Sequence, residues 1–286
     1  MTLAQLVPLA LQVSIALIVL ALGLETRAGD LSYLIRRPWL CARSVLAMNV
    51  VMPLLTTLIL RPLDLRPEVK VALVLLAVSP VPPILPQKHA KAGGNLSYAI
   101  GLLVISSVVS IVTVPASVAL IAGAFGRAVE VPMALIAKTV ILSVLGPLVV
   151  GALVQRAAPS FADKAVKPAS IAGTVLLPVA FIPVVIGSWH AVIGEMGHGT
   201  LVAIVAFTLA GLLVGHMLGG PVPENRTVLG LSTAVRHPGV ATAIAGAVAQ
   251  DTKGVAAAVL LCLIVSAVVT APYVSSRKRA ATAAIT

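Results

Sequence analysis

The residues of this sequence best suited to bind a charged ligand are adjacent to one another: Arg236, His237, Pro238 and Gly239. They interrupt an otherwise apolar run, Thr227 to Ala249. A guanidinium binds carboxylates through charge-assisted hydrogen bonds. A Pro-Gly pair can begin a new helix, whose first N–H groups and positive dipole end also favour an anion. This group of residues therefore predicts an anion-binding site at a helix break.

Enzymatic chemistry has little support in the pattern of residues. All nine acidic residues lie in, or at the edges of, the polar gaps between apolar runs: Glu25, Asp30, Asp64, Glu68, Glu130, Asp163, Glu195, Glu224 and Asp251. The sequence has no carboxylate pair inside an apolar run, no His-rich metal motif and no GxSxG nucleophile motif. Cys41 and Cys262 lie within apolar runs, as small buried side chains do. An enzyme is the least favoured class of function, and no metal or cofactor is predicted.

The composition shows which elements must position these residues. Of the 286 residues, 59% are hydrophobic and only 10% are charged, against about 25% in soluble domains. Apolar runs of about 20 residues recur along the chain, and they indicate a polytopic membrane protein whose partner is the lipid bilayer. The net charge of +11 does not indicate nucleic acid, because the Lys and Arg residues lie in short gaps rather than along a basic helix with aromatic residues.

Nine apolar runs are long enough to cross a bilayer. They are Leu6 to Leu24, Leu40 to Leu60, Val71 to Ala92, Leu96 to Ala122, Pro132 to Val154, Ala169 to Ser188, Thr200 to Leu218, Thr227 to Ala249 and Val255 to Val274. The gaps between them are too short for a soluble domain. The pattern predicts an all-α membrane protein in which residues 1–286 form one transmembrane unit of nine helices.

Two of the nine runs should be broken helices. The third run contains Pro80, Pro82, Pro83 and Pro86 within seven residues, and no continuous helix accommodates prolines so placed. The eighth is divided at Arg236, although an ordinary loop there is the alternative. These runs are five crossings apart and therefore point in opposite directions, which predicts inverted repeats with a site near the membrane midplane.

Small polar residues near the predicted breaks are candidates to line the site. The full candidate set is Asn49, Ser79, Pro82, Pro83, Ser107, Ser110, Ser232, Thr233, Arg236, His237, Pro238, Gly239 and Ser266. For the hydroxyl and amide residues, the alternative role is to join packed helices. Arg236 could instead bond carbonyls released by the prolines of the third run. His237 is either a buried structural histidine or a proton-coupling group.

Several stretches together resemble the bile acid:sodium symporter family. They are ALGLETRAGDLSYLIRRPWL to NVVMP, VALVLLAVSPVPP, GGNLSYAIGLLVISSVVSIVTVP and LSTAVRHPGVATAIAGAVA. The resemblance implies ten helices in two inverted repeats, here without the first helix. It also implies a core domain at about residues 40–122 and 198–275, and a panel domain at about residues 6–24 and 132–188.

The sequence departs from the family where the family binds sodium. The resemblance places Leu85-Pro86 and Ser232 at sodium-ligand positions, Arg236-His237 at a Gln-Asn pair, and Met48 at a Gln. Sodium is possible by resemblance, but its ligands are not matched. We therefore expect a sodium-independent secondary transporter of a small organic anion. The alternatives are a sodium-coupled symporter of bile-acid or pantoate-like carboxylates, and a proton-coupled carrier or uniporter similar to auxin efflux carriers. No pattern indicates an oligomeric state.

The Lys and Arg residues predict the orientation in the inner (cytoplasmic) membrane. The gaps after the odd-numbered runs contain 13 of these residues, whereas the other gaps contain five: Arg61, Arg66, Lys70, Arg127 and Lys253. Because Lys- and Arg-rich short loops remain cytoplasmic, the N-terminus should lie outside and the C-terminus in the cytoplasm.

Reporter fusions test this orientation. Alkaline phosphatase fused to the C-terminus should be inactive, because the tail Arg277-Lys278-Arg279 is expected in the cytoplasm. An active C-terminal fusion would contradict either the number of crossings or their direction.

Overall fold

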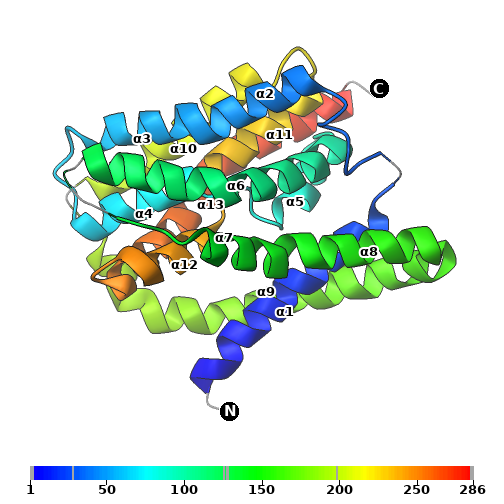
Figure 1. Cartoon of the computed structure of the whole chain (residues 1–286), viewed down its shortest axis with the longest axis horizontal. Coiled ribbons are helices and arrows are strands. Elements are labelled where there is room, and N and C mark those ends of the chain that lie inside the picture. Colours follow the sequence, from blue (N-terminus) through cyan, green and yellow to red (C-terminus); the bar gives the residue numbers. More distant parts are fainter. Residues whose placement is uncertain (1–2, 28, 125, 127–128, 198, 284–286) are drawn as a thin grey trace.

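The computed structural model describes residues 3–27, 29–124, 126, 129–197 and 199–283 of the chain, and every regular element among them is helical (Figure 1). This confirms the all-α class. The α-helices are α1 (Leu3–Glu25), α2 (Pro38–Leu46), α3 (Met52–Leu60), α4 (Pro67–Val78), α5 (Leu85–Lys91), α6 (Leu96–Ala124), α7 (Met133–Val140), α8 (Gly146–Ala157), α9 (Pro159–Gly194), α10 (Thr200–Leu218), α11 (Pro223–Ala234), α12 (Pro238–Val248) and α13 (Thr252–Ala283).

Seven helical segments among the described residues are long and apolar enough to cross a membrane. Two of these segments contain a short π-helix: η1 (Ala47–Val51) joins α2 to α3, and η2 (Ile141–Leu145) joins α7 to α8. The other two predicted crossings are each divided into two helices. Arg127, which the charge count includes, lies outside the described residues.

Both predicted breaks are present. Helix α4 ends at Val78 and α5 begins at Leu85, while α11 ends at Ala234 and α12 begins at Pro238. Extended residues follow α4 and α11, at Ser79 (ψ 151°) and Val235 (ψ 120°). Pro86 and Pro238 lie in the first turns of the new helices, where the missing N–H has no cost. The first break covers residues 79–84 and the second covers residues 235–237. Each break therefore ends before the last proline of the stretch that predicted it.

The predicted runs Pro132 to Val154 and Ala169 to Ser188 leave a polar gap at residues 155–168, and the prediction of a loop over this gap is wrong. Only Ala158 separates α8 from α9, which begins with Pro159. Proline fixes a helical φ at the first position of a helix. The charged residues expected in a loop, Asp163, Lys164 and Lys167, instead lie exposed on the first turns of α9. The charged residues here correctly indicated contact with solvent, but they did not indicate the end of a helix.

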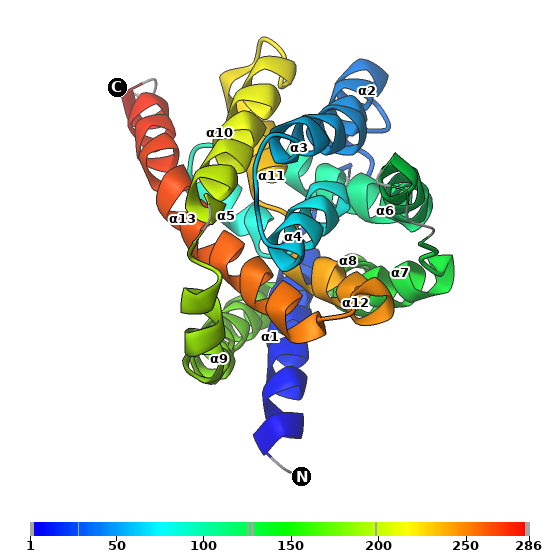
Figure 2. The same ribbon diagram turned by 90° about the vertical axis from the view of Figure 1, so that its left-hand side faces the viewer.

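The helices form two packed groups. Helices α1, α8 and α9 pack on one another, and both views place them apart from α2, α3 and α10 (Figures 1 and 2). The second group includes α3, α4 and α10 to α13, which contact one another in several pairs. The breaks lie within this second group.

Helix ends gather at two places. At one, Arg66 forms an ion pair with Glu195 at 3.8 Å, and a Cβ on Gly254 would lie 2.8 Å from Glu68 Cγ. At the other, Arg277 donates to Thr227 Oγ1 at 2.9 Å and to the Pro223 carbonyl at 3.0 Å. These groupings agree with the alternation of the predicted crossings.

The contact between α1 and α8 gives a stability prediction. A Cβ on Gly151 would lie 2.8 Å from Gly23 Cα, whereas a Cβ on Gly187 would meet nothing within 4 Å. We expect Gly151→Ala to lower the free energy of unfolding by about 1–3 kcal/mol, because backbone atoms cannot move aside. Gly187→Ala should be neutral or stabilising. Melting temperatures in one detergent check this, and equal values for the two variants would contradict it.

Candidate functional site

The two helix breaks meet in the interior. The backbone N–H of His237 donates to the Pro80 carbonyl at 3.0 Å. The N–H of Val81 donates to Ser106 Oγ on α6 at 3.3 Å. Backbone groups released by the breaks are thus bonded to other elements, as irregular backbone at membrane depth requires.

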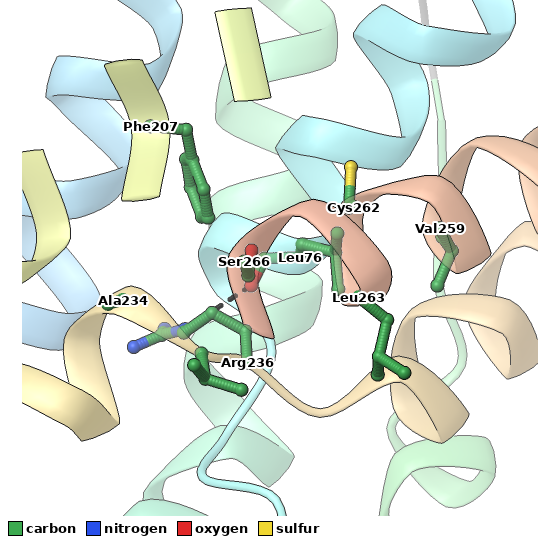
Figure 3. A pocket seen from close by; sticks show the side chains of 9 residues that line it. Leu76, Phe207, Ala234, Arg236, Val259, Cys262, Leu263 and Ser266 are labelled. Atoms are coloured by element: carbon green, nitrogen blue, oxygen red, sulfur yellow. Dashed lines mark hydrogen bonds between the residues drawn. The ribbon is translucent and has the colours of Figure 1, made fainter. Parts of the chain in front are cut away.

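Arg236 connects three elements at this crossing. Its side chain is buried, and Nε donates to the Leu76 carbonyl at 3.3 Å. Nη2 donates to the carbonyls of Ala77 at 2.6 Å and Met48 at 3.0 Å. Figure 3 shows the guanidinium directed back toward Ala234 on α11, with its bond to Leu76 dashed. The arginine is therefore bonded to backbone.

The carbonyls of Leu76 and Ala77 lack their usual helical partners because of the prolines in the first break, although the Leu76 carbonyl also accepts from the Ser79 N–H at 3.0 Å. The helical partner of the Leu76 carbonyl would be the N–H of residue 80, which is a proline. The partner of Ala77 would be the N–H of Val81, which bonds Ser106 instead. These carbonyls also form the negative end of α4, which favours a cation.

The Met48 carbonyl is available for a related reason. In η1 the N–H of Met52 bonds Ala47 rather than Met48. A bond in this π register would then join Met48 to the N–H of residue 53, which is also a proline. The sequence-based predictions did not include this contact, although the Met52-Pro53 pair at the start of α3 was the available signal.

The remaining nitrogen of Arg236 has no protein partner. Nη1 is buried and unbonded among the described residues. A cavity of about 10 Å³ adjoins Arg236, which is room for about one water. Its lining residues are Leu76, Phe207, Ala234, Val235, Arg236, Val259, Cys262, Leu263 and Ser266 (Figure 3). The site is closed around Arg236 in this conformation.

His237 acts as the N-cap of α12. Its Nδ1 accepts from the Val240 N–H at 3.4 Å, which requires a neutral ring with the proton on Nε2. Nε2 is buried without a partner in the described part of the chain. One of the N–H groups expected to face an anion is thus bonded to His237. Pro238 is partly buried and Gly239 is exposed.

Four polar candidates are engaged in local or helix-joining bonds. Ser79 Oγ donates to the Leu75 carbonyl, Ser110 Oγ to the Ser107 carbonyl, and Thr233 Oγ1 to carbonyls within α11. Asn49 Oδ1 accepts from Thr113 on α6 at 3.1 Å. Only the bond between Asn49 and Thr113 joins two packed elements, whereas the other three side chains bond carbonyls three or four residues earlier in the chain.

Of the remaining candidates, two serines have buried hydroxyls without a partner in the described chain, one serine lines the cavity, and two prolines are buried. Ser107 Oγ and Ser232 Oγ are buried without partners in the described structure. Ser266 shares a hydrogen bond with Thr208 at 3.0 Å and lines the cavity beside Arg236. Pro82 and Pro83 are buried in the first break.

Comparison with known proteins identifies the family. The model of the Sodium Bile acid symporter family matches residues 12–193, well over half of the chain. The matched region includes the first break and ends before α11 and Arg236. A search of curated proteins gives no match. The chain belongs to the Sodium Bile acid symporter family, whose members are secondary transporters and not enzymes.

Proposed function

We propose that this protein is a sodium-independent secondary transporter of a small organic anion, with Arg236 as a fixed cation at the crossing. One observation carries the proposal: the guanidinium bonds the carbonyls of Leu76, Ala77 and Met48. Carbonyls of unwound helix ends are the groups with which transporters coordinate sodium. Here they already have a cationic partner.

The residues around Arg236 do not fit a sodium ion. A buried sodium ion needs several oxygen ligands, but three backbone carbonyls at this crossing bond the guanidinium instead. Arg236 would also repel a second cation. The only ion pair found among the described residues joins Arg66 to Glu195, so no carboxylate there offsets the charge of Arg236.

The unbonded groups support an anionic substrate. Nη1 of Arg236, Nε2 of His237 and the hydroxyls of Ser107 and Ser232 are buried donors without partners in the described chain. Of these residues Arg236 lines the cavity, and a carboxylate entering from a wider state of that cavity would satisfy its Nη1. Because Nε and Nη2 are already engaged, Arg236 would present one nitrogen to the substrate rather than a bidentate fork.

We propose that the transporter has nine crossings, arranged as inverted repeats without the first helix of the family. The two broken crossings would lie at its centre. The panel comprises residues 6–24 and 132–188, and the core comprises residues 40–122 and 198–275; mutual packing of α1, α8 and α9 supports this division. Movement of the core against the panel would open the site alternately. The protein would lie in the inner membrane with its C-terminus in the cytoplasm.

Replacing Arg236 tests its fixed role. Arg236→Ala should lower the free energy of unfolding by about 2–4 kcal/mol, because buried carbonyls at Ala77 and Met48 would lose a hydrogen-bond partner. The free energy of unfolding of Arg236→Lys should lie between those of Arg236→Ala and the parent protein, since an ammonium cannot reproduce the planar fork of the guanidinium. The control is Lys138→Ala, which removes an exposed cation from α7. Equal melting temperatures for Arg236→Ala and this control would contradict the role.

Sodium dependence tests the mechanism. Melting of the parent protein should be the same in NaCl and KCl at equal ionic strength. Arg236→Ala should gain stabilisation specific to sodium if the freed carbonyls then coordinate the ion. Counterflow of organic anions in proteoliposomes should persist when potassium replaces sodium at fixed membrane potential. Sodium-dependent counterflow would refute the proposal, and dependence on a proton gradient would favour the proton-coupled alternative.

A further inference from the structure

An isolated carboxylate lies at the corner where α9 meets α10. Glu195 directly follows α9, and its side chain is only 8% exposed. Oε1 lies 3.8 Å from Nη1 of Arg66, which is 44% exposed. Oε2 is buried without a hydrogen-bond partner among the described residues. A buried carboxylate held by one long, half-exposed ion pair is poorly compensated for its loss of water.

The charged groups acting on Glu195 come from two other places in the fold. Arg66 precedes α4, Glu68 lies in its first turn, and Asp251 immediately precedes α13. Gly254 brings the last two together, because a Cβ there would contact both side chains. Asp251 is itself stabilised, since its Oδ1 accepts from the Gly254 N–H at 2.9 Å. Of the two carboxylates Asp251 and Glu195, only the second lacks such a bond.

The corner itself has few other bonds to the rest of the structure. Gly199 adopts a left-handed conformation with φ of +81° and caps α10. Thr200, the first residue of α10, has a buried hydroxyl without a partner in the described chain. Helix α9 belongs to the packed group of α1 and α8, whereas α10 packs with α11 and α13. The corner therefore connects the two groups of helices.

We propose that Glu195 is a proton-binding residue that acts as a latch on this corner. Ionised Glu195 is paired with Arg66 at the start of α4, but it is poorly compensated where it is buried. A proton taken from solution neutralises the carboxylate and removes the cost of burying its charge, so the neutral side chain stays in the corner more readily than the ionised one. The two helix groups are then more strongly coupled at acidic pH than at neutral pH.

The direction of titration follows from the surroundings. Burial raises the pKa of the Glu195 carboxyl above its ordinary value, Arg66 lowers it, and Glu68 and Asp251 raise it further. The folded protein then binds this proton more tightly than the unfolded chain does. The resulting stabilisation is present at low pH and is lost as the pH rises through the folded-state pKa. Glu195→Gln should therefore be no less stable than the parent protein at neutral pH.

A tryptophan near the corner can report the latch. Trp189 lies in α9, six residues before Glu195, and Trp39 is the only other tryptophan. Trp39→Phe therefore leaves one fluorophore. His190→Gln and His198→Gln complete the reporter background, because these two histidines are the nearest to Trp189 in the sequence and their removal leaves the signal without a contribution from either. The fluorescence of the full-length reporter is followed in detergent between about pH 4 and pH 8.

We expect a single transition with a midpoint above the ordinary Glu range, and we expect Glu195→Gln to show the acid-form signal at every pH. Arg66→Gln should raise the midpoint and Glu68→Gln should lower it, each by about half a pH unit because the site is partly screened. Arg61→Gln is the matched control, because Arg61 is exposed and lies in the same connection between α3 and α4 as Arg66. It should not shift the midpoint.

Two results would overturn the latch. One is a transition that persists in Glu195→Gln, and the other is a midpoint that Arg66→Gln lowers or leaves unchanged. The measurement involves neither sodium nor an anion, so its failure would leave the proposed transport function to its own tests.

Discussion

The interior of this protein depends on how buried carbonyl oxygens are satisfied at the helix crossing. The proline at position 53 removes the N–H group that would bond the Met48 carbonyl. The proline at position 80 removes the usual helical partner of the Leu76 carbonyl, which keeps only the bond from Ser79 within its own chain segment. In a lipid environment no water replaces these N–H groups. The guanidinium of Arg236 reaches the carbonyls of Leu76, Ala77 and Met48 from a third element and so holds α4, η1 and the second break together.

A covalently attached cation differs from a bound ion in its consequences. Sodium can enter and leave, so that its gradient can drive a conformational cycle, whereas an arginine side chain remains at the crossing throughout. Under the proposed function the charge of the site is constant, and the substrate or another titrating group changes the conformation. Nη1 of Arg236 has no partner among the described residues, and a small cavity lies beside Arg236.

The two groups of helices are built by different means. Close backbone approach at Gly23 and Gly151 joins α1 to α8, because small residues allow membrane helices to pack without an aqueous hydrophobic effect. The group that contains the breaks relies more on hydrogen bonds between elements, such as those of His237 to Pro80 and of Thr208 to Ser266. The charged contact of Arg66 with Glu195 lies at the ends of helices, where Arg66 is half-exposed and Glu195 is buried.

Hydropathy and proline placement in the sequence alone determined the helical class, the approximate positions of the crossings and both breaks, because these follow from the local cost of exposing backbone to lipid. The buried arginine was also visible, together with two possible partners for it. Only the tertiary structure shows which carbonyls Arg236 bonds, since the Met48 and Ala77 carbonyls are 188 and 159 residues away along the chain. The length of α9 was missed because charged residues can continue a helix beyond the apolar region. The corner carboxylate Glu195 was an ordinary gap residue until the fold buried it beside Arg66, because burial depends on neighbours that no local pattern specifies.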